Sequence, residues 1–328
     1  MVLMVNKVHE RIAKSAQTRV ERELTHLTFQ AMGTQCRASF AAPSPQAGRN
    51  FTAQLLDWVA EFESTYSRFL PESVVSRINQ NAGIAWVEID PNTERLLALC
   101  AEMNFLTRGV FDPTALPLIQ LWNWKAAPPV IPTADEIKST LQKVGWRKVQ
   151  RRPGAIFLPE PGMALDLGGI GKEYAVDMAI QLAVQSGVAD VLIDFGQDLK
   201  VHGIPPGRPA WHIGLEDPLN PGKCWTGLAV LNAAVASSGD YFRRFELNGR
   251  RYGHILDPRT GYPVDNGCRA VSVIAPNCTI AGILSTAAFV LGAKDGLALI
   301  ETQPGASGCI TTDTSRIPSR RFYEYVVH

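Results

Sequence analysis

The chain has 328 residues, 46% of them hydrophobic, which is enough for a sizeable apolar core. Its 32 basic and 31 acidic residues give a formal charge of +1, which argues against nucleic acid, a membrane surface or a polyacidic protein as the partner. Any anionic ligand must therefore be bound by a local group of residues.

The 6 cysteines include no CxxC pair and no metal-ligand spacing, which is typical of reduced, partly buried thiols. The apolar residues 1–5 are followed at once by charged residues, so a signal-peptide core is not expected there. No uninterrupted apolar run approaches the roughly 18 residues of a membrane span. These features predict a cytoplasmic protein without membrane insertion.

Residues 1–25 are expected to form a charged N-terminal extension. Within it, residues 6–24 have the pattern of a charged, exposed helix or a frayed tail, because Val8, Ile12 and Val20 are too few to anchor the segment firmly. Strand-like alternation with β-branched residues follows over residues 25–40, interrupted by a tight turn.

Apolar residues at helical spacing predict helices over residues 51–69 and 91–109, and another helix directly after the glycines near residue 170. Residues 188–196 are typical of a buried strand. The rest of the chain has mainly short strands, with the clearest hairpin over residues 242–256. Strands grouped in hairpins with helices between them favour an α+β fold.

Three glycines, Gly168, Gly169 and Gly171, lie between a predicted strand that reaches Asp166 and a predicted helix that begins near Lys172. Backbone N–H groups at a helix N-terminus bind anions, and the missing side chains let a phosphate approach. The spacing fits neither a P-loop nor a GxGxxG motif. By itself the loop is as consistent with a purely structural turn as with a phosphate site.

Two further loops carry polar groups. His254 precedes a turn at Asp257 and is a candidate general base, although a lone histidine is more often structural or solvated. Residues 236–245 contain small hydroxyls and Asp240, a pattern typical of a ligand rim or of an ordinary turn.

A small polar strip lies on an otherwise apolar predicted helix that begins near residue 279. Gly282, Ser285 and Thr286 fall at positions i, i+3 and i+4, so they share one helix face. Their hydroxyls either bond to the preceding turn of a tightly packed helix or face a ligand site.

Taken in order, these segments resemble the FAD:protein FMN transferases, the ApbE-type flavin transferases, over about residues 28–325. The matching segments are AMGT (31–34), STYSRFLPESVVSRIN (64–79), FDPTALPLIQLW (111–122), LDLGGIGKEYAVD (165–177), SGDYFRRF (238–245), HILDPRTGYPV (254–264) and LSTA (284–287). The resemblance implies an α+β, T-fold-like architecture with largely antiparallel sheets and packed helices. It implies one flavin transferase domain over residues 26–328, with room for two lobes.

Enzymes of this family cleave FAD at its pyrophosphate, attach FMN by a phosphoester to a threonine or serine of a target flavoprotein, and release AMP. The resemblance therefore implies FAD as substrate or bound ligand, Mg²⁺ as cofactor and an acceptor flavoprotein as partner. The glycine loop and Lys172 suit a pyrophosphate, because phosphoryl transfer depends mainly on positioning and charge neutralisation. The attacking hydroxyl needs a base, a role for His254, with Asp257 and Asp240 as rivals.

The resemblance also implies an FAD site that combines apolar and aromatic faces for the ring systems with carboxylates for ribose hydroxyls or ring nitrogens. Its residues are Met32, Tyr66, Phe111, Asp112, Asp166, Lys172 and Ile255. Tyr66 and Phe111 are equally suited to the core.

The metal site that the resemblance implies departs from the family pattern. The family combines a backbone carbonyl of the glycine loop, at Gly169 here, with a threonine, at Thr286 beside Ser285, and an aspartate four residues earlier. Gly282 stands at that aspartate position. Because Mg²⁺ usually keeps one or two protein carboxylates, this loss should weaken the site considerably.

Two smaller departures accompany it. Glu173 occupies a usual glycine position after the lysine, and Gln197 stands where the family commonly has a second glycine. Glu173, Asp198 and Asp240 each have a carboxylate that would substitute for the missing one if it reached the site.

The leading hypothesis is a cytoplasmic, Mg²⁺-dependent FMN transferase that uses FAD. The alternative is a non-catalytic FAD-binding protein, a carrier, sensor or assembly factor, that has lost the metal-ligand aspartate. A further alternative is an FAD pyrophosphatase, in which water replaces the protein hydroxyl.

Overall fold

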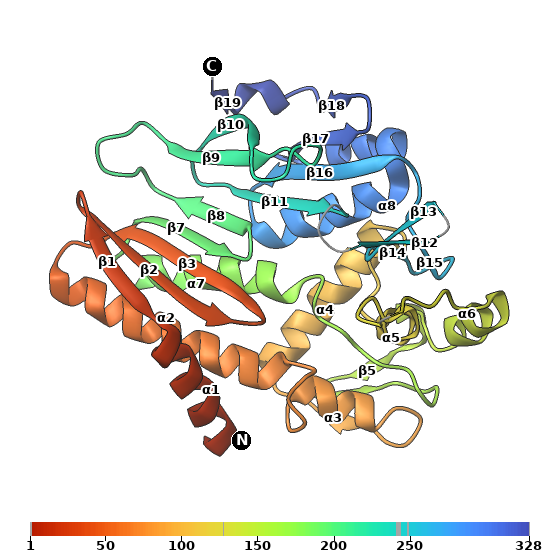
Figure 1. Ribbon diagram of the computed structural model, residues 1–328. Helices are drawn as coiled ribbons and strands as arrows, with labels where there is room; N and C mark the ends of the chain where they lie inside the picture. Colours follow the sequence, from red (N-terminus) through yellow and green to blue (C-terminus); the bar gives the residue numbers. More distant parts are fainter. Residues whose placement is uncertain (1, 127, 241–243, 248, 328) are drawn as a thin grey trace.

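An antiparallel sheet runs through the centre of the molecule (Figure 1). The computed structural model describes residues 2–126, 128–240, 244–247 and 249–327. In this part of the chain nine strands lie in the order β1-β2-β3-β7-β8-β11-β16-β17-β18, and each neighbouring pair is antiparallel. They are β1 Gln17–Glu21, β2 Leu24–Ala31, β3 Thr34–Ala41, β7 Asp190–Phe195, β8 Asp198–His202, β11 Ala234–Gly239, β16 Cys268–Ala275, β17 Ser307–Thr312 and β18 Arg316–Pro318.

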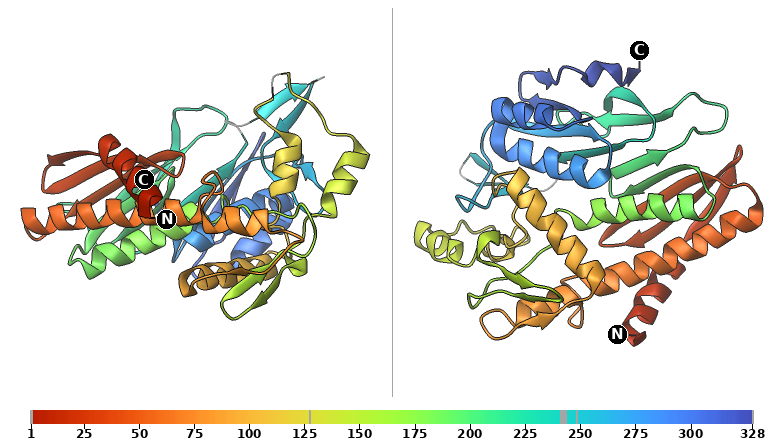
Figure 2. Two further views of the ribbon diagram at one scale, coloured as in Figure 1. Left: turned by 90° about the horizontal axis from the view of Figure 1, so that it is seen from below. Right: turned by 180° about the vertical axis from the view of Figure 1, so that it is seen from behind.

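Three long helices cover one face of this sheet (Figures 1 and 2). They are α2 Pro45–Tyr66, α7 Gly171–Gln185 and α8 Cys278–Thr302. Because side chains alternate across a strand, Val271 and Val273 of β16 enter the core under the helices, whereas Ile274 enters a core on the opposite face. The α+β architecture with antiparallel sheets and packed helices is confirmed.

A second sheet of three strands covers part of the opposite face. Its order is β19-β10-β9. Trp211, Ile213 and Leu215, which alternate along β9, pack with Leu199 and Val201 of β8. The bounds are β9 Trp211–Glu216, β10 Cys224–Val230 and β19 Val326–Val327. The central strands are therefore covered on both faces.

A further core lies beside the first, under α3 (Val74–Gln80) and α4 (Pro91–Leu106). It includes Leu167 and Ile170 of the glycine loop and Ile283 of α8. A small sheet completes it, with strands β4 Val87–Glu88, β6 Ala155–Phe157 and β5 Gln150–Arg152. The residues that pack against both cores are Tyr66, Leu106, Tyr174 and Ile280. The glycine loop thus lies where the two cores meet.

The N-terminal segment is anchored more firmly than the sequence predicts. Helix α1 (Val2–Ser15) packs against α2, with Val8 6% and Ile12 0% exposed, and β1 pairs with β2. The predicted helix is therefore present and β1 is exposed throughout, but the expectation of weak anchoring is wrong, because two correctly spaced apolar residues are enough when a neighbouring helix packs against them. Val20 does remain 74% exposed.

Most local predictions of secondary structure are confirmed. Residues 25–40 form β2 and β3, and the turn between them places Met32 and Gly33 at φ values of 52° and 73°. The predicted hairpin consists of β12 (Arg244–Leu247) and β13 (Arg250–Gly253), while residues 242, 243 and 248 of that prediction lie outside the described residues. The remaining elements are α5 Leu116–Trp122, α6 Ala134–Leu141, β14 Leu256–Asp257, β15 Tyr262–Pro263 and the short 3-10 helices Trp146–Lys148 and Phe322–Glu324.

Helix α8 is the one described helix that is long and apolar enough to cross a membrane by length and composition. It packs against β11, β16 and β17, and its backbone leaves the helical conformation at Gly292, with φ 84° and ψ 176°. A buried core helix has the same length and composition, so this feature is weak support for a membrane span.

Candidate active site

The glycine loop leads directly into the first turn of α7. Ile170 precedes the helix, and its side chain makes no hydrogen bond to the first turn. A side-chain cap would otherwise satisfy one of the free N–H groups of that turn. The N-terminus of a 15-residue helix therefore meets the loop without a side-chain cap. This is the arrangement that favours an anion, since the helix dipole and its N–H groups point the same way.

Asp166 fixes the start of this loop. Its Oδ1 accepts a hydrogen bond from the N–H of Gly168 at 2.9 Å, and its Oδ2 lies 3.1 Å from Nε of Arg68. Asn79 holds the preceding residue through two hydrogen bonds to the N–H and C=O of Leu165, at 2.7 and 3.0 Å. Arg68 and Asn79 lie in the segment 64–79, yet only Tyr66 was predicted from it, because their partners are far away in the sequence.

Lys172 lies between two carboxylates. Its Nζ donates to Oδ2 of Asp198 and lies 3.6 Å from Oε1 of Glu173. Burial alone would lower the pKa of Lys172, but the two carboxylates outweigh it and raise that pKa above its ordinary value. The amine is therefore held as a cation at the base of the glycine loop, which is the charge that the predicted phosphate contact needs.

Glu173 and Gly282 face each other across the contact between α7 and α8. A Cβ atom built on Gly282 would lie 2.5 Å from Cγ, 3.1 Å from Oε1 and 3.2 Å from Cδ of Glu173. The Glu173 side chain thus fills the space that a side chain at position 282 would occupy. Burial raises the pKa of Glu173 to about 7, against the opposing effect of Lys172.

The two hydroxyls predicted for the metal site lie together, and a third joins them. Ser238, near the end of β11, has its Oγ 2.8 Å from both Oγ of Ser285 and Oγ1 of Thr286. Ser285 also donates to the carbonyl of Gly282 at 2.9 Å, the helical back-bond expected from its position. Ser238 was not predicted individually, although it begins the segment SGDYFRRF.

Phe111 and Gly169 are brought together by the fold. A Cβ on Gly169 would lie 3.6 Å from Cε2 of Phe111, so the ring lies against the bare backbone of the loop. Asp112 is half-buried, and its carboxylate accepts hydrogen bonds from the N–H and hydroxyl of Thr114 and from the N–H of Trp146, at 2.6–2.9 Å. These bonds tie two loops together beside Phe111. Burial raises the pKa of Asp112.

Met32 and Tyr66 are both partly buried and pack against the first core. The N–H of Met32 donates to Oε2 of Glu63 at 2.8 Å, which holds the strained turn in place. The Tyr66 hydroxyl lies 3.4 Å from Oγ1 of Thr93, and burial raises its pKa to about 12. Tyr66 is therefore a neutral hydrogen-bonding phenol, suited to a ring or a hydroxyl contact.

The candidate base lies on a different segment, between β13 and β14. His254 is half-buried there, and the carbonyl of Ile255 accepts a hydrogen bond from the N–H of Val264 at 3.0 Å. Asp257 caps its own turn and forms a two-point ion pair with Arg259, at 2.9 and 2.8 Å. This carboxylate is committed to the turn, which leaves His254 as the better candidate.

Asp240 is likewise paired. Its Oδ1 accepts from Nη2 of Arg251 at 2.7 Å, and its Oδ2 lies 3.8 Å from Nη1 of Arg269. Burial raises the pKa of Asp240 despite the two arginines. As a substitute metal ligand, this carboxylate would have to leave those ion pairs.

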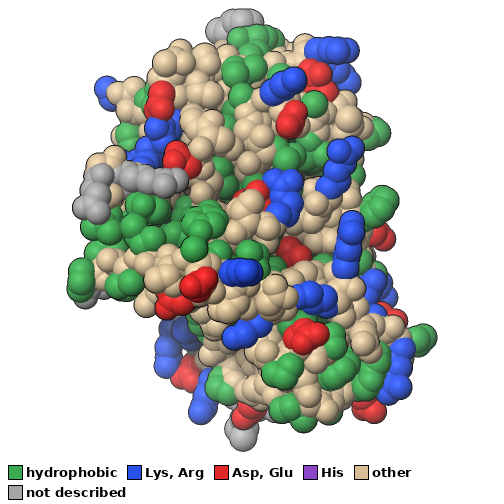
Figure 3. Space-filling model, turned by 90° about the vertical axis from the view of Figure 1, so that its right-hand side faces the viewer, with side chains coloured by type: hydrophobic (Ala, Val, Ile, Leu, Met, Phe, Trp, Pro, Cys, Tyr) green, Lys and Arg blue, Asp and Glu red, His purple; other side chains and the backbone are tan. Residues whose placement is uncertain are grey.

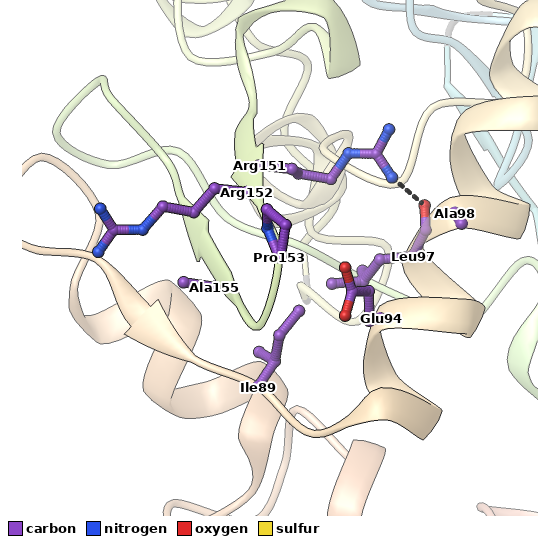
Figure 4. A pocket seen from close by; sticks show the side chains of 8 residues that line it. All are labelled: Ile89, Glu94, Leu97, Ala98, Arg151, Arg152, Pro153 and Ala155. Carbon is purple, nitrogen blue, oxygen red and sulfur yellow. Dashed lines mark hydrogen bonds between the residues drawn. The ribbon is translucent and has the colours of Figure 1, made fainter.

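A recess of about 250 Å³ lies elsewhere, between α4 and the hairpin of β5 and β6 (Figure 4). Arg151 crosses it and donates to the carbonyl of Leu97 at 3.2 Å. This recess contains none of the residues predicted to bind FAD or metal.

On the face shown in Figure 3, basic and acidic side chains are interspersed without an extended field of one sign. A field of one sign that would attract anions over a long range is therefore absent from this face.

Comparison with known proteins identifies the family. The model of the ApbE family matches residues 32–310. An FAD:protein FMN transferase of Treponema pallidum is 30% identical over 303 residues, which cover 87% of this chain and 84% of that protein. One of Haemophilus influenzae is 29% identical over 296 residues, covering 86% and 84%. The structure of an ApbE protein of Thermotoga maritima superposes with a TM-score of 0.84 at 31% identity, over 93% of this chain and 100% of that one. This chain therefore belongs to the ApbE family.

Proposed function

We propose that this protein is an FAD:protein FMN transferase, as its relatives in Treponema pallidum and Haemophilus influenzae are named. The observation that carries the proposal is the contact of Glu173 with Gly282, which sets the start of α7, with the uncapped glycine loop and the Lys172 cation, against α8. The hydroxyls of Ser285 and Thr286, joined by that of Ser238, follow Gly282 on α8. These groups offer backbone donors, a cation and hard oxygen atoms, which are the parts that a pyrophosphate substrate requires.

In this proposal each group has a stated task. The loop N–H groups and Lys172 bind the pyrophosphate of FAD, while Phe111 and Tyr66 contact its ring systems. The hydroxyl oxygen of the acceptor attacks the phosphorus on the FMN side, the bond from that phosphorus to the bridging oxygen breaks, and AMP leaves with that oxygen. His254 accepts the proton of the attacking hydroxyl.

Mg²⁺ belongs to the proposal as the cofactor. The carbonyl of Gly169 and the hydroxyls of Ser285 and Thr286 are oxygen donors of the kind that Mg²⁺ prefers, and the last two share one helix face with Gly282. When bound, the ion would neutralise phosphate charge. The cytoplasmic location expected from the sequence stays a prediction.

The alternative, a non-catalytic FAD-binding protein, rests on the missing aspartate at position 282. The two functions differ in products. Purified protein is incubated with FAD and Mg²⁺, with and without an acceptor flavoprotein domain, and AMP, free FMN and protein-bound flavin fluorescence are measured. Equal amounts of AMP and bound flavin would support the transferase. AMP with free FMN in the absence of acceptor would indicate a pyrophosphatase, and quenching of FAD fluorescence without AMP would indicate a binding protein.

A further inference from the structure

We propose that Glu173 supplies, from α7, the metal-binding carboxylate that position 282 of α8 lacks. The inference deepens the proposed function and rests on it for the identity of the cation site. It assigns to this chain a rearranged site, in which the carboxylate reaches the same space from the opposite helix.

The first argument is the shared space. The atoms Cγ, Cδ and Oε1 of Glu173 all lie within 3.2 Å of the position a Cβ at residue 282 would take. An aspartate carboxylate extends a similar distance from its own Cβ, so the Glu173 carboxylate lies in the region that an aspartate at 282 would reach. The sequence departs from the family pattern twice, with a glutamate for a glycine at position 173 and a glycine for an aspartate at position 282. Both departures are explained if the carboxylate has moved from α8 to α7.

The second argument is an unsatisfied buried oxygen. Glu173 is 6% exposed, and its Oε2 is buried without a hydrogen-bond partner in the part of the chain that the structure describes. Buried carboxylate oxygens are normally hydrogen-bonded, because an unpaired one loses its hydration without compensation. A cation at this oxygen would supply the missing partner.

The third argument is charge. Lys172 is the cation that contacts both Glu173 and Asp198, so this buried group has one positive and two negative side chains whenever both carboxyl groups are ionised. An excess negative charge in a buried group is costly unless it is paired. A divalent cation would offset it, and it would also leave Lys172 able to contact a phosphate.

The remaining donors lie on the same face. Thr286 follows Gly282 by one helical turn, and Ser285 bonds to the Gly282 carbonyl. Among the described residues, no group of three or more histidine, cysteine, aspartate and glutamate side chains is arranged to hold a metal ion. The donor set proposed here has one carboxylate with hydroxyl and backbone oxygens, a composition that suits Mg²⁺ or Mn²⁺.

The experiment uses Mn²⁺ as the probe, because it accepts the same oxygen ligands and its free form is quantified by electron paramagnetic resonance. Mn²⁺ is titrated, with and without FAD, into the wild type, Glu173→Gln, Glu173→Gly and the exchange variant Glu173→Gly/Gly282→Asp. Glu102→Gln, an exposed glutamate of α4, is the matched control. Circular dichroism melting checks that each variant folds.

We expect Glu173→Gln and Glu173→Gly to bind Mn²⁺ at least about tenfold more weakly, since even residues that only orient metal ligands contribute about 10–100-fold. The exchange variant should recover most of the affinity, and the control should match the wild type. Recovery by the exchange variant also excludes misfolding as the cause of the loss.

Wild-type affinity in Glu173→Gln, or an exchange variant no tighter than Glu173→Gly, would overturn the inference. The proposed function is scored separately by AMP release from FAD. Mn²⁺ binding that depends on Glu173, without AMP release, would support this inference and argue against the proposed transferase function. AMP release together with Mn²⁺ binding that does not depend on Glu173 would support the transferase and overturn this inference.

Discussion

Asp177 of α7 holds the first turn of α8. Its carboxylate accepts hydrogen bonds from the N–H groups of Cys278 and Thr279, at 3.0 and 2.9 Å, and from the Thr279 hydroxyl at 2.8 Å. Lys200 of β8 lies 2.9 Å from the same carboxylate. Because α7 carries the glycine loop and α8 carries Gly282 and the hydroxyls, this one side chain fixes the two halves of the site relative to each other.

Replacing this residue should therefore destabilise the whole protein. Asp177→Ala leaves the Lys200 cation and the buried N–H groups without their partner, which we expect to cost about 3 kcal/mol of unfolding free energy. Guanidinium chloride denaturation measures the change. Asp295→Ala, an exposed position on α8, should change stability by less than about 0.5 kcal/mol. Equal effects of the two substitutions would show that the Asp177 cap contributes nothing specific.

The close approach of Glu173 and Gly282 gives a prediction about stability that needs no metal. An alanine at an ordinary helical glycine stabilises the helix by about 1 kcal/mol. Gly282→Ala should instead destabilise the protein by about 1–3 kcal/mol, because its Cβ would meet Glu173 Cγ at 2.5 Å.

The matched comparison for this prediction is the same substitution in a Glu173→Gly background, where the space is open and the alanine should be stabilising. Denaturation in EDTA of all four proteins gives the interaction energy. If Gly282→Ala stabilises the wild type as well, Glu173 does not occupy that space in solution. The same contact means that Gly282→Asp alone brings two carboxylates into one space and should not improve metal binding.

The charge at Lys172 should be needed for FAD binding. Lys172→Met removes the cation that Asp198 and Glu173 hold at the glycine loop, and we expect FAD affinity to fall about tenfold or more, the value of a hydrogen bond to a charged group. Lys172→Arg keeps the charge and should lose less. Quenching of flavin fluorescence in EDTA measures both. FAD bound equally by the methionine variant would place the pyrophosphate elsewhere.

The sequence predicts the elements whose signals are local. Apolar spacing and a terminal glycine predict α7, and the turn between β2 and β3 follows from the glycine at position 33. The burial of Val8 and Ile12 is not local, because it depends on the surface that α2 presents, and that prediction failed.

In the candidate site, too, local sequence signals do not predict the contacts between distant residues. Gly282 and Glu173 are both visible as departures in the sequence, but nothing local indicates that one side chain fills the space of the other. The roles of Arg68, Asn79 and Asp177 are hidden for the same reason, since each acts on a backbone or carboxylate group that only the fold brings near.

The cysteines give a prediction about reactivity. Cys224 is exposed, whereas burial raises the pKa of Cys36 and Cys100 to about 12 and of Cys268 and Cys309 to about 11. Only the thiolate reacts, so at about pH 8 these buried thiols stay protonated as well as inaccessible. Titration of the folded protein with Ellman's reagent should therefore detect one thiol, and titration in denaturant all 6.

Raising the pH from about 7 to about 9 should add no further reactive thiol, because the buried thiols titrate well above this range. Cys224→Ser should abolish the reaction of the folded protein and leave five thiols in denaturant. Two or more reactive thiols in the folded wild type, or fewer than six in denaturant without reductant, would contradict the buried, reduced cysteines of this fold.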